Sequence, residues 1–257
     1  MRDEKLLLCE LSYLKCFSEH FEYKDFIQFR DNLIIDMYSH NLTYFIRKEM
    51  DNQTIQDYVE QEITHCLSKG KKYCNLIFSG SVNDLLISYF KKQPEVTIYG
   101  FYVFDKLFLS KLKGKENCVV VKVDSTEMVE EIVQLDLEQY GDWGTDFCNR
   151  RGRRNGKVYL AKDGVESFIC YDNGVAIGKC DLFINDGVAK IEDFDVLPKY
   201  QRKGYGSALL KEIICKALEQ NAKLIYLVTD EYDTAKEMYL KIGFEKAGEK
   251  TQLFFTL

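Results

Sequence analysis

The sequence of 257 residues has only two prolines, only three histidines and no long apolar run. So little proline beside a hydrophobic content of 46% is typical of a folded globular protein and excludes a long disordered tail. No window approaches the roughly 18 consecutive apolar residues of a membrane span, and the charged residues 2–5 precede no long apolar core of a signal peptide. We therefore expect a soluble, cytoplasmic protein without a membrane partner.

The sequence also lacks an excess of positive charge and the spacing of a metal site. Its formal net charge of −6 argues against a protein that holds nucleic acid through phosphate contacts, and it is compatible with a cationic, amine-bearing substrate. The nine cysteines form no C-x-x-C pair, and only three histidines could join them. We expect no metal, no nucleic-acid partner, and reduced, mostly buried cysteines.

One stretch, residues 195–210, has the composition of a phosphate-binding loop between a strand and a helix. Gly204 and Gly206 lack a Cβ, so their backbone N–H groups can approach an anion closely. The helix expected from about Ser207 adds unpaired N–H groups and the positive end of its dipole, and Arg202 and Lys203 add full charges. The absence of G-x-G-x-x-G and of a following Gly-Lys-Ser/Thr disfavours Rossmann and P-loop sites. The alternative is an ordinary strand-to-helix turn.

The predicted elements of the C-terminal half lead the chain directly into this loop. Two Asn/Asp-Gly turns, at 173–174 and 186–187, are strong hairpin signals that join three antiparallel strands. The strands are expected at 166–171, 175–184 and 188–196. A strand at 118–123 and helices at 124–140 and 145–151 precede them, and a helix at 207–220, a strand at 224–229, a short helix at 234–241 and a final strand at 252–257 follow.

Two motifs, together with this order of elements, resemble the GNAT (GCN5-related N-acetyltransferase) superfamily over residues 117–257. The first is Gln201-Arg202-Lys203-Gly204-Tyr205-Gly206 after Val196-Leu197-Pro198, which looks like the family's acetyl-CoA loop, Q/R-x-x-G-x-G/A. The second, residues 235–244, looks like the family's A-x-x-x-Y-x-K-x-G-F. The resemblance implies an α/β (α+β) fold with a mixed, mostly antiparallel sheet flanked by helices.

The resemblance further implies an N-acetyltransferase that moves an acetyl group from acetyl-CoA, its co-substrate, to a primary amine by direct transfer. Tyr239 would donate a proton to the CoA sulfur, with simple packing of its ring as the alternative. The base would be Glu192, Asp193 or water, and we favour Glu192 because strand alternation puts it on one face with Phe194 and Val196. The residues implied to bind acetyl-CoA are the strand backbone at Phe194, Asp195 and Val196 and the loop residues Gln201, Arg202, Lys203, Gly204, Tyr205, Gly206 and Ser207.

The N-terminal half is predicted to be a second α/β domain. Its helices are expected near 7–14, 54–67 and 83–92, and its strands at 33–38, 42–46, 73–78 and 96–104. Residues 89–92 ahead of Gly100-Phe101 faintly resemble residues 239–241 ahead of Gly243-Phe244, which suggests a degenerate GNAT-like domain without a second acetyl-CoA loop. We take residues 111–117 as a linker and predict domains at 1–115 and 116–257.

Several alternatives stay open at this point. The basic group Arg150, Arg151, Arg153 and Arg154 is predicted to form a solvated face, or else to contact CoA phosphates. A catalytically silent acyl-CoA-binding or regulatory module is a second function class. A third is an interaction protein that binds a partner through an exposed apolar patch on its N-terminal half. The sequence leaves open the acceptor, a small-molecule or peptide amine, and the oligomeric state.

Overall fold

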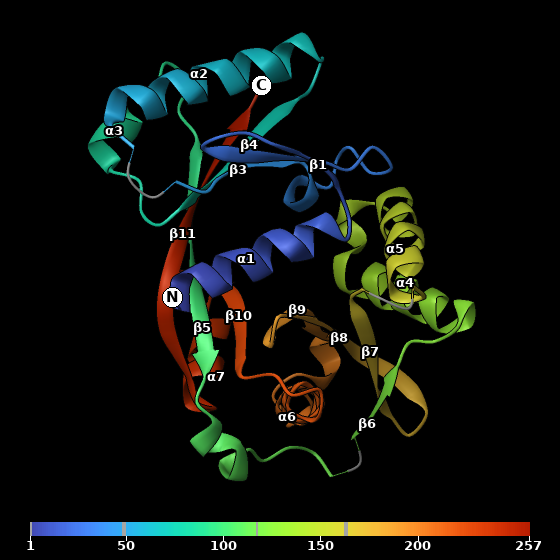
Figure 1. The fold of residues 1–257 in the computed structure, drawn as a ribbon. Helices are drawn as coiled ribbons and strands as arrows, with labels where there is room; N and C mark the ends of the chain where they lie inside the picture. The colour runs from blue at the N-terminus through green and yellow to red at the C-terminus, as the bar shows by residue number, and fades with distance from the viewer. Residues whose placement is uncertain (1, 48–49, 117, 162–163) are drawn as a thin grey trace. The chain divides into compact units, whose positions relative to one another are not determined.

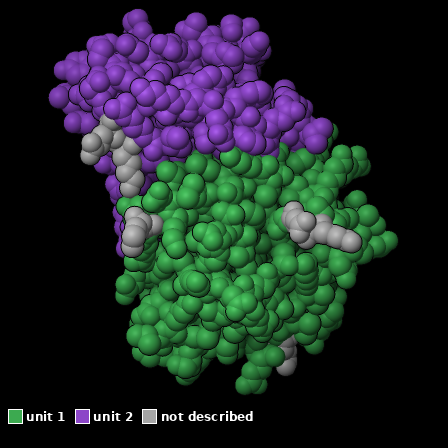
Figure 2. Space-filling model, viewed as in Figure 1, with its two compact units in different colours: residues 1–17, 102–228, 237–245 green, residues 18–101, 229–236, 246–257 purple. Residues whose placement is uncertain are grey.

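A computed structural model describes residues 2–47, 50–116, 118–161 and 164–257 (Figure 1). The chain forms two compact units, each made of segments that are far apart in the sequence (Figure 2). Unit 1 comprises residues 1–17, 102–228 and 237–245, and unit 2 comprises residues 18–101, 229–236 and 246–257. This division differs from a boundary at residues 115 and 116, so the domains 1–115 and 116–257 stay a prediction.

Unit 1 is built on a sheet with the strand order β10-β9-β8-β7-β6. These strands are β6 (Cys118–Lys122), β7 (Glu166–Asp172), β8 (Val175–Asn185), β9 (Val188–Val196) and β10 (Leu224–Asp230). Neighbouring strands are antiparallel except for the parallel pair β9 and β10. Its helices are α1 (Arg2–Lys15), α4 (Thr126–Tyr140), α5 (Thr145–Tyr159), α6 (Tyr205–Glu219) and most of α7 (Ala235–Lys241). The predicted mixed, mostly antiparallel sheet flanked by helices is confirmed.

Two tight turns produce the antiparallel strands that lead into the loop. Asn173 and Gly174 have φ of 49° and 79°, and Asp186 and Gly187 have φ of 46° and 71°. Consecutive residues with positive φ give a turn whose twist matches that of the flanking strands, and Asn, Asp and Gly tolerate this conformation best. Both predicted hairpins, β7–β8 and β8–β9, are therefore confirmed.

Helices α4 and α5 pack unusually closely because two glycines of α5 face valines of α4. A Cβ on Gly152 would lie 2.2 Å from Cγ2 of Val133, and one on Gly156 would lie 2.5 Å from Cγ1 of Val129. Helix α5 extends to Tyr159, whereas the sequence analysis ended it at 151. The apolar residues that α5 packs against belong to α4. The sequence of α5 alone therefore does not show how far the helix extends.

Unit 2 contains a mixed sheet with the order β1-β2-β3-β4-β11-β5. The strands are β1 (Glu19–Glu22), β2 (Phe26–Arg30), β3 (Leu42–Phe45), β4 (Tyr73–Ser79) and parts of β5 (Glu95–Phe104) and β11 (Phe244–Thr256), and the helices are α2 (Asn52–Ser68) and α3 (Asp84–Ser88). A short 3-10 turn of this unit is η1 (Tyr38–His40), and those of unit 1 are η2 (Lys106–Lys111), η3 (Gly141–Trp143) and η4 (Pro198–Tyr200). Phe45 and Phe78 stack at 4.4 Å in a buried core that α2 and α3 help to close. A second α/β unit is thus confirmed.

The predicted strand at 33–38 is wrong, because polar side chains satisfy the backbone there. The Asp31 carboxylate accepts hydrogen bonds from the backbone N–H groups of Leu33 and Ile34. The amide of Asn41 donates to the carbonyls of Ile34 and Met37. Such local bonds replace the ladder that a strand would need.

Candidate functional site

Strand β9 leaves its parallel neighbour β10 halfway along its length. The paired positions run from Val188 with Leu224 to Ile191 with Leu227. Beyond them, residues 192–196 have no paired residue on β10 among the residues described, although Asp195 and Val196 stay paired with β8. One edge of β9 therefore presents backbone N–H and C=O groups that an extended ligand could pair with.

The same segment of β9 contains a bulge. Glu192 pairs with Asp181 and Asp195 pairs with Lys179, so two residues of β9 face the single residue between them on β8. Asp193, one of the two, has a φ of 50°. The extra residue breaks the strict alternation of the strand. The prediction that Glu192 shares a face with Phe194 and Val196 is therefore wrong.

On one face of β9 the two sequence motifs meet at Phe194. The Phe194 ring contacts the Tyr239 ring edge-to-face, with centroids 6.4 Å apart and planes at 65°. A Cβ on Gly206 would lie 3.4 Å from Cζ of Phe194 and 3.9 Å from Cγ2 of Val196. Tyr239 is buried, and its ring also contacts Phe244 at 6.0 Å. The structure thus brings together four of the predicted site residues.

The loop between β9 and α6 has the geometry of an anion cradle. Gln201 donates a side-chain hydrogen bond of 2.8 Å to the carbonyl of Val196, which ties the loop to the end of β9. Gly204, with φ of 89°, is the N-cap of α6 and has no side chain to cap the first-turn N–H groups. Helix α6 begins at Tyr205, two residues earlier than predicted. Arg202 and Lys203 are exposed beside it.

Not every loop residue offers its side chain to the cradle. A hydrogen bond with the Asp172 carboxylate raises the pKa of Tyr205 to about 12, so that hydroxyl is already engaged. Ser207 is half-buried in the first turn of α6. Lys203 donates through its ammonium to the Lys199 carbonyl at 2.6 Å. Tyr205 can therefore contribute only its backbone.

The segment predicted as a linker packs against this loop. A Cβ on Gly114 would lie 2.4 Å from Cα of Ala208, which leaves room for no side chain. The Lys115 N–H donates to the Gly204 carbonyl at 3.2 Å. Asn117 lies outside the described residues. Residues 112–116 thus pack against the start of α6 and do not form a flexible linker.

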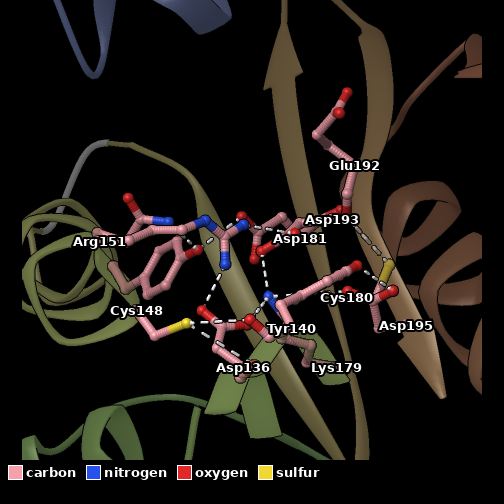
Figure 3. A network of polar contacts seen from close by, with 12 residues as sticks. Asp136, Tyr140, Cys148, Arg151, Lys179, Cys180, Asp181, Glu192, Asp193 and Asp195 are labelled. Carbon is pink, nitrogen blue, oxygen red and sulfur yellow. Dashed lines mark hydrogen bonds and ion pairs between the residues drawn. The ribbon is translucent and has the colours of Figure 1, made fainter. Parts of the chain in front are cut away.

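Glu192 lies on the other face of β9, in a second chain of charges. Its carboxylate is 2.8 Å from the ammonium of Lys190, which is itself 2.5 Å from the carboxylate of Glu10 on α1. Tyr226 also donates to Glu10, at 2.9 Å. The Glu192 side chain is 36% exposed, and Figure 3 shows it pointing away from the neighbouring carboxylates. The Glu192 carboxylate is therefore fixed by its ion pair with Lys190 and still partly exposed to solvent.

Asp193, in contrast, is enclosed by cations (Figure 3). Its carboxylate is 2.6 Å from Arg151 and 2.5 Å from Lys179. Burial raises the pKa of Asp193, but the attraction of Arg151 and Lys179 outweighs it and holds the pKa well below its usual range. A carboxylate bound by two cations is a poor proton acceptor. Of the two acidic candidates, only Glu192 retains the exposure that a base needs.

Two of the four arginines in the basic group, Arg151 and Arg154, are buried, whereas Arg153 is exposed as a solvated face would require. Arg151 is buried and bonded to Asp136 and Asp193. Arg154 is buried with its guanidinium 4.8 Å from the Phe17 ring centroid. Both earlier alternatives are therefore wrong for these two arginines, because Arg151 is bonded to acids of α4 and β9 and Arg154 lies against the Phe17 ring, partners that are far away in the sequence.

Two further acids have raised pKa values. Burial is the main reason that the pKa of Asp181 rises to about 8, with the negative charge of Asp193 adding to it. Burial also raises the pKa of Asp195, whose carboxylate accepts a 2.6 Å hydrogen bond from the Tyr140 hydroxyl. The Asp195 side chain is thus engaged and is not available to a ligand.

Sequence reasoning missed Asp136, Tyr140, Arg151 and Lys179 as neighbours of β9. Two signals were visible: Asp136 follows the buried Leu135 on α4, and Lys179 lies between Ile177 and Cys180 in a mostly apolar strand. A charged residue in an apolar position is a sign of a buried partner.

No described helix combines the length and the apolar composition needed to cross a membrane. Within the same described ranges, no group of three or more His, Cys, Asp or Glu is arranged as metal ligands. All nine cysteines are free thiols, six of them buried, in agreement with the prediction that they are reduced and mostly buried.

Residues 129–244 match the family model described as the acetyltransferase (GNAT) family. A curated relative, an uncharacterized N-acetyltransferase named CgeE from Bacillus subtilis (strain 168), is 40% identical over 108 residues. That alignment covers 40% of this chain and 41% of CgeE, so the chain matches about two fifths of the length of this curated relative.

Two solved structures share the fold over nearly the whole chain. A functionally unknown conserved protein from Staphylococcus epidermidis ATCC 12228 has a TM-score of 0.76 and 19% identity, covering 93% of this chain and 94% of its own. A GCN5-related N-acetyltransferase from Kribbella flavida has a TM-score of 0.71 and 14% identity, covering 98% of this chain and 94% of its own. The family match spans the bulged strand, the glycine loop and the helix of Tyr239, so this part of the chain is similar to the acetyltransferase (GNAT) family.

Proposed function

We propose that this protein is an acetyl-CoA-dependent N-acetyltransferase that transfers an acetyl group directly to a primary amine. The observation that carries the proposal is the open edge of β9, which ends in the uncapped loop at the start of α6. A strand edge can pair with an extended amide-containing arm, and a helix N-terminus favours phosphate. Pantetheine and pyrophosphate occur together, in this order, in CoA.

The residues present fit acetyl-CoA as a co-substrate. The backbone of Phe194, Asp195 and Val196 would pair with the pantetheine arm, and the loop Gln201, Arg202, Lys203, Gly204, Tyr205, Gly206 and Ser207 would hold the pyrophosphate. Gly206 supports this because a Cβ there would meet Phe194 and Val196 at 3.4 and 3.9 Å, which keeps the helix start close to the strand edge. The thioester of acetyl-CoA supplies the activated acetyl group.

Tyr239 is proposed as the proton donor to the departing sulfur. Its ring is fixed by Phe194 on one side and Phe244 on the other, so the position of the hydroxyl relative to the β9 edge is defined. A positioned general acid typically contributes roughly 10²–10⁴-fold to a rate. Packing alone remains the competing role, and substitution by phenylalanine separates the two.

Glu192 is proposed as the base that prepares the amine, directly or through a water molecule. Its carboxylate is held by Lys190 and keeps a solvent-accessible oxygen, whereas Asp193 is neutralised by two cations. The exposed carboxylate and the net charge of −6 favour a cationic acceptor, either a small molecule or a peptide amine.

A CoA-release assay over a panel of amines tests the proposal, with protein and acetyl-CoA alone as the blank. The panel should include polyamines, amino acids, aminoglycosides and lysine peptides. We expect amine-dependent release of free thiol and mass-spectrometric detection of the acetylated amine. Thermal stabilisation by acetyl-CoA without release on any amine would instead favour a silent acyl-CoA-binding module.

A further inference from the structure

Four elements of unit 1 converge on one buried ionic cluster: Asp136 of α4, Arg151 of α5, Lys179 of β8 and Asp193 of β9 (Figure 3). Lys179 is 2.6 Å from Asp136 and 2.5 Å from Asp193, and Arg151 bonds to the same two carboxylates. The side chains of Lys179 and Asp136 are 1% exposed. The cluster therefore holds two cations between two close anions, with the Asp195 carboxylate a further 3.9 Å neighbour of Lys179.

The cluster acts on the backbone at the bulge of β9. Asp193 is a non-glycine residue with a φ of 50°, a sparsely populated conformation that persists where the surrounding structure imposes it. Its carboxylate is bonded to Arg151 and Lys179 and is 13% exposed. These two bonds fix the side chain from two directions and thereby the backbone that carries it. Phe194, the next residue, is the one whose ring meets Tyr239 and Gly206 on the opposite face.

Stability alone is a weak reason for such a cluster. Burying four charges has a large desolvation cost, and apolar replacements of similar volume often match or exceed the stability of a buried ion network. An ionic cluster instead fixes the positions and orientations of its side chains, because each of its hydrogen bonds has a preferred length and angle. The close contact of Gly152 with Val133 keeps α5 near α4, which holds Arg151 beside Asp136.

We propose that Asp193, Lys179 and Arg151 are positioning residues that hold the bulge so that the open edge of β9 at Phe194 and Val196 meets the acyl donor. The inference rests on the proposed function, because it assigns the cluster to the same donor site. None of the three side chains needs to touch the donor. They act through the strand, from the face opposite Tyr239.

Two variants separate positioning from mere stability. Asp193→Asn keeps the size of the side chain and tolerates positive φ, but it leaves two cations with one carboxylate, that of Asp136, in close contact. We expect a lower melting temperature. The double variant Lys179→Met/Asp193→Asn removes one charge of each sign, so it should recover at least half of that loss. The matched control is Glu62→Gln in unit 2, a buried carboxylate that accepts bonds from Gln28 and Thr43.

The kinetic expectation differs for the two roles. With positioning, kcat for acetyl transfer falls at least tenfold in both cluster variants, whereas the Kd of CoA changes less than threefold because the pyrophosphate loop is untouched. Glu62→Gln should lose stability and keep its kcat. A double variant with recovered melting temperature and a kcat within twofold of wild type would overturn the proposal.

Hydrogen–deuterium exchange provides a readout that does not depend on turnover. In the wild-type protein, acetyl-CoA should protect the amides of residues 194–196 and of the loop at 204–206. In the double variant the loop protection should persist and the strand protection should be lost. Strand protection that persists in the double variant refutes positioning. A wild-type protein that shows both protections but acetylates no amine refutes the proposed function and leaves the positioning role standing.

Discussion

Gly206 offers a sharp test of the acetyl-CoA loop, because alanine and valine should have opposite effects there. A Cβ at this position would lie 3.4 Å from Cζ of Phe194, 3.9 Å from Sδ of Met238 and 3.9 Å from Cγ2 of Val196. These are ordinary contact distances, so alanine fits. Burial of the added methyl group stabilises the folded state by about 0.8 kcal/mol. The higher helix propensity of alanine contributes up to about 1 kcal/mol. We expect Gly206→Ala to be about 1 kcal/mol more stable than wild type.

Valine adds two further carbons beyond the Cβ, in space that the Phe194 ring occupies. Overpacking of this kind typically costs about 1–3 kcal/mol and displaces the neighbours. Since Phe194 and Val196 carry the open backbone edge, the displacement should disrupt the donor site as well as the fold. Gly206→Val should therefore lose acetyl-CoA binding, whereas Gly206→Ala should retain it.

Thermal unfolding with and without acetyl-CoA measures both effects. A ligand that binds only the native state adds about 2.7 kcal/mol at 100 times its Kd, which wild type and Gly206→Ala should both show. Calorimetry then gives the Kd of each folded variant, and we expect one site per chain. Unchanged affinity in a well-folded Gly206→Val protein would refute the assignment of the loop to acetyl-CoA.

Three further predictions concern other parts of unit 1. Tyr239→Phe should lower kcat at least tenfold, about 1.4 kcal/mol, with the melting temperature and the Kd of acetyl-CoA nearly unchanged; full turnover with an accepted amine would remove Tyr239 from the mechanism. The pKa of Asp181 rises from 3.8 to about 8 on folding, so the folded state binds the proton more tightly and this group lowers stability as pH rises between these values. In urea unfolding, Asp181→Asn should reduce this decrease in the free energy of unfolding by up to about 1.4 kcal/mol per pH unit. An unchanged pH dependence would contradict the raised pKa of Asp181. Gly152→Ala should destabilise by about 1–3 kcal/mol because its Cβ would lie 2.2 Å from Val133, and a gain in stability would show that α5 can move away.

The loop and the hairpins were predictable from the sequence because their physics is local. Gly204 and the turn residues Asn173 and Asp186 adopt positive φ where their neighbours in sequence already require it. That Phe194 and Tyr239 serve one site was implied only by a resemblance, and their ring contact joins two short motifs of fixed spacing. The order of elements in this part of the chain followed from such local signals.

The bulge and its ionic cluster were not predictable in this way. A bulge depends on the register between two strands, and Glu192 and Asp193 look equivalent in the sequence. Arg151 resembled a surface arginine because its partners, Asp136 and Asp193, are 15 and 42 residues away. Tertiary packing decides that Glu192 is partly exposed and that Asp193 is bound by two cations. No local sequence pattern indicates this difference.

Helix α1 has a consequence for the way the chain is made. It is synthesised well before its partners, because Cys9 bonds to the carbonyl of Val188 and Glu10 accepts from Tyr226, over separations of 179 and 216 residues. At about 5–20 residues per second, the ribosome needs on the order of ten seconds or more to supply these partners. During that time the apolar side chains of α1, among them Leu6 and Leu11, have no native surface to cover. Unit 1 must therefore complete its fold after Val188 and Tyr226 have emerged, and a chaperone that shields α1 until then should increase the yield of the folded protein.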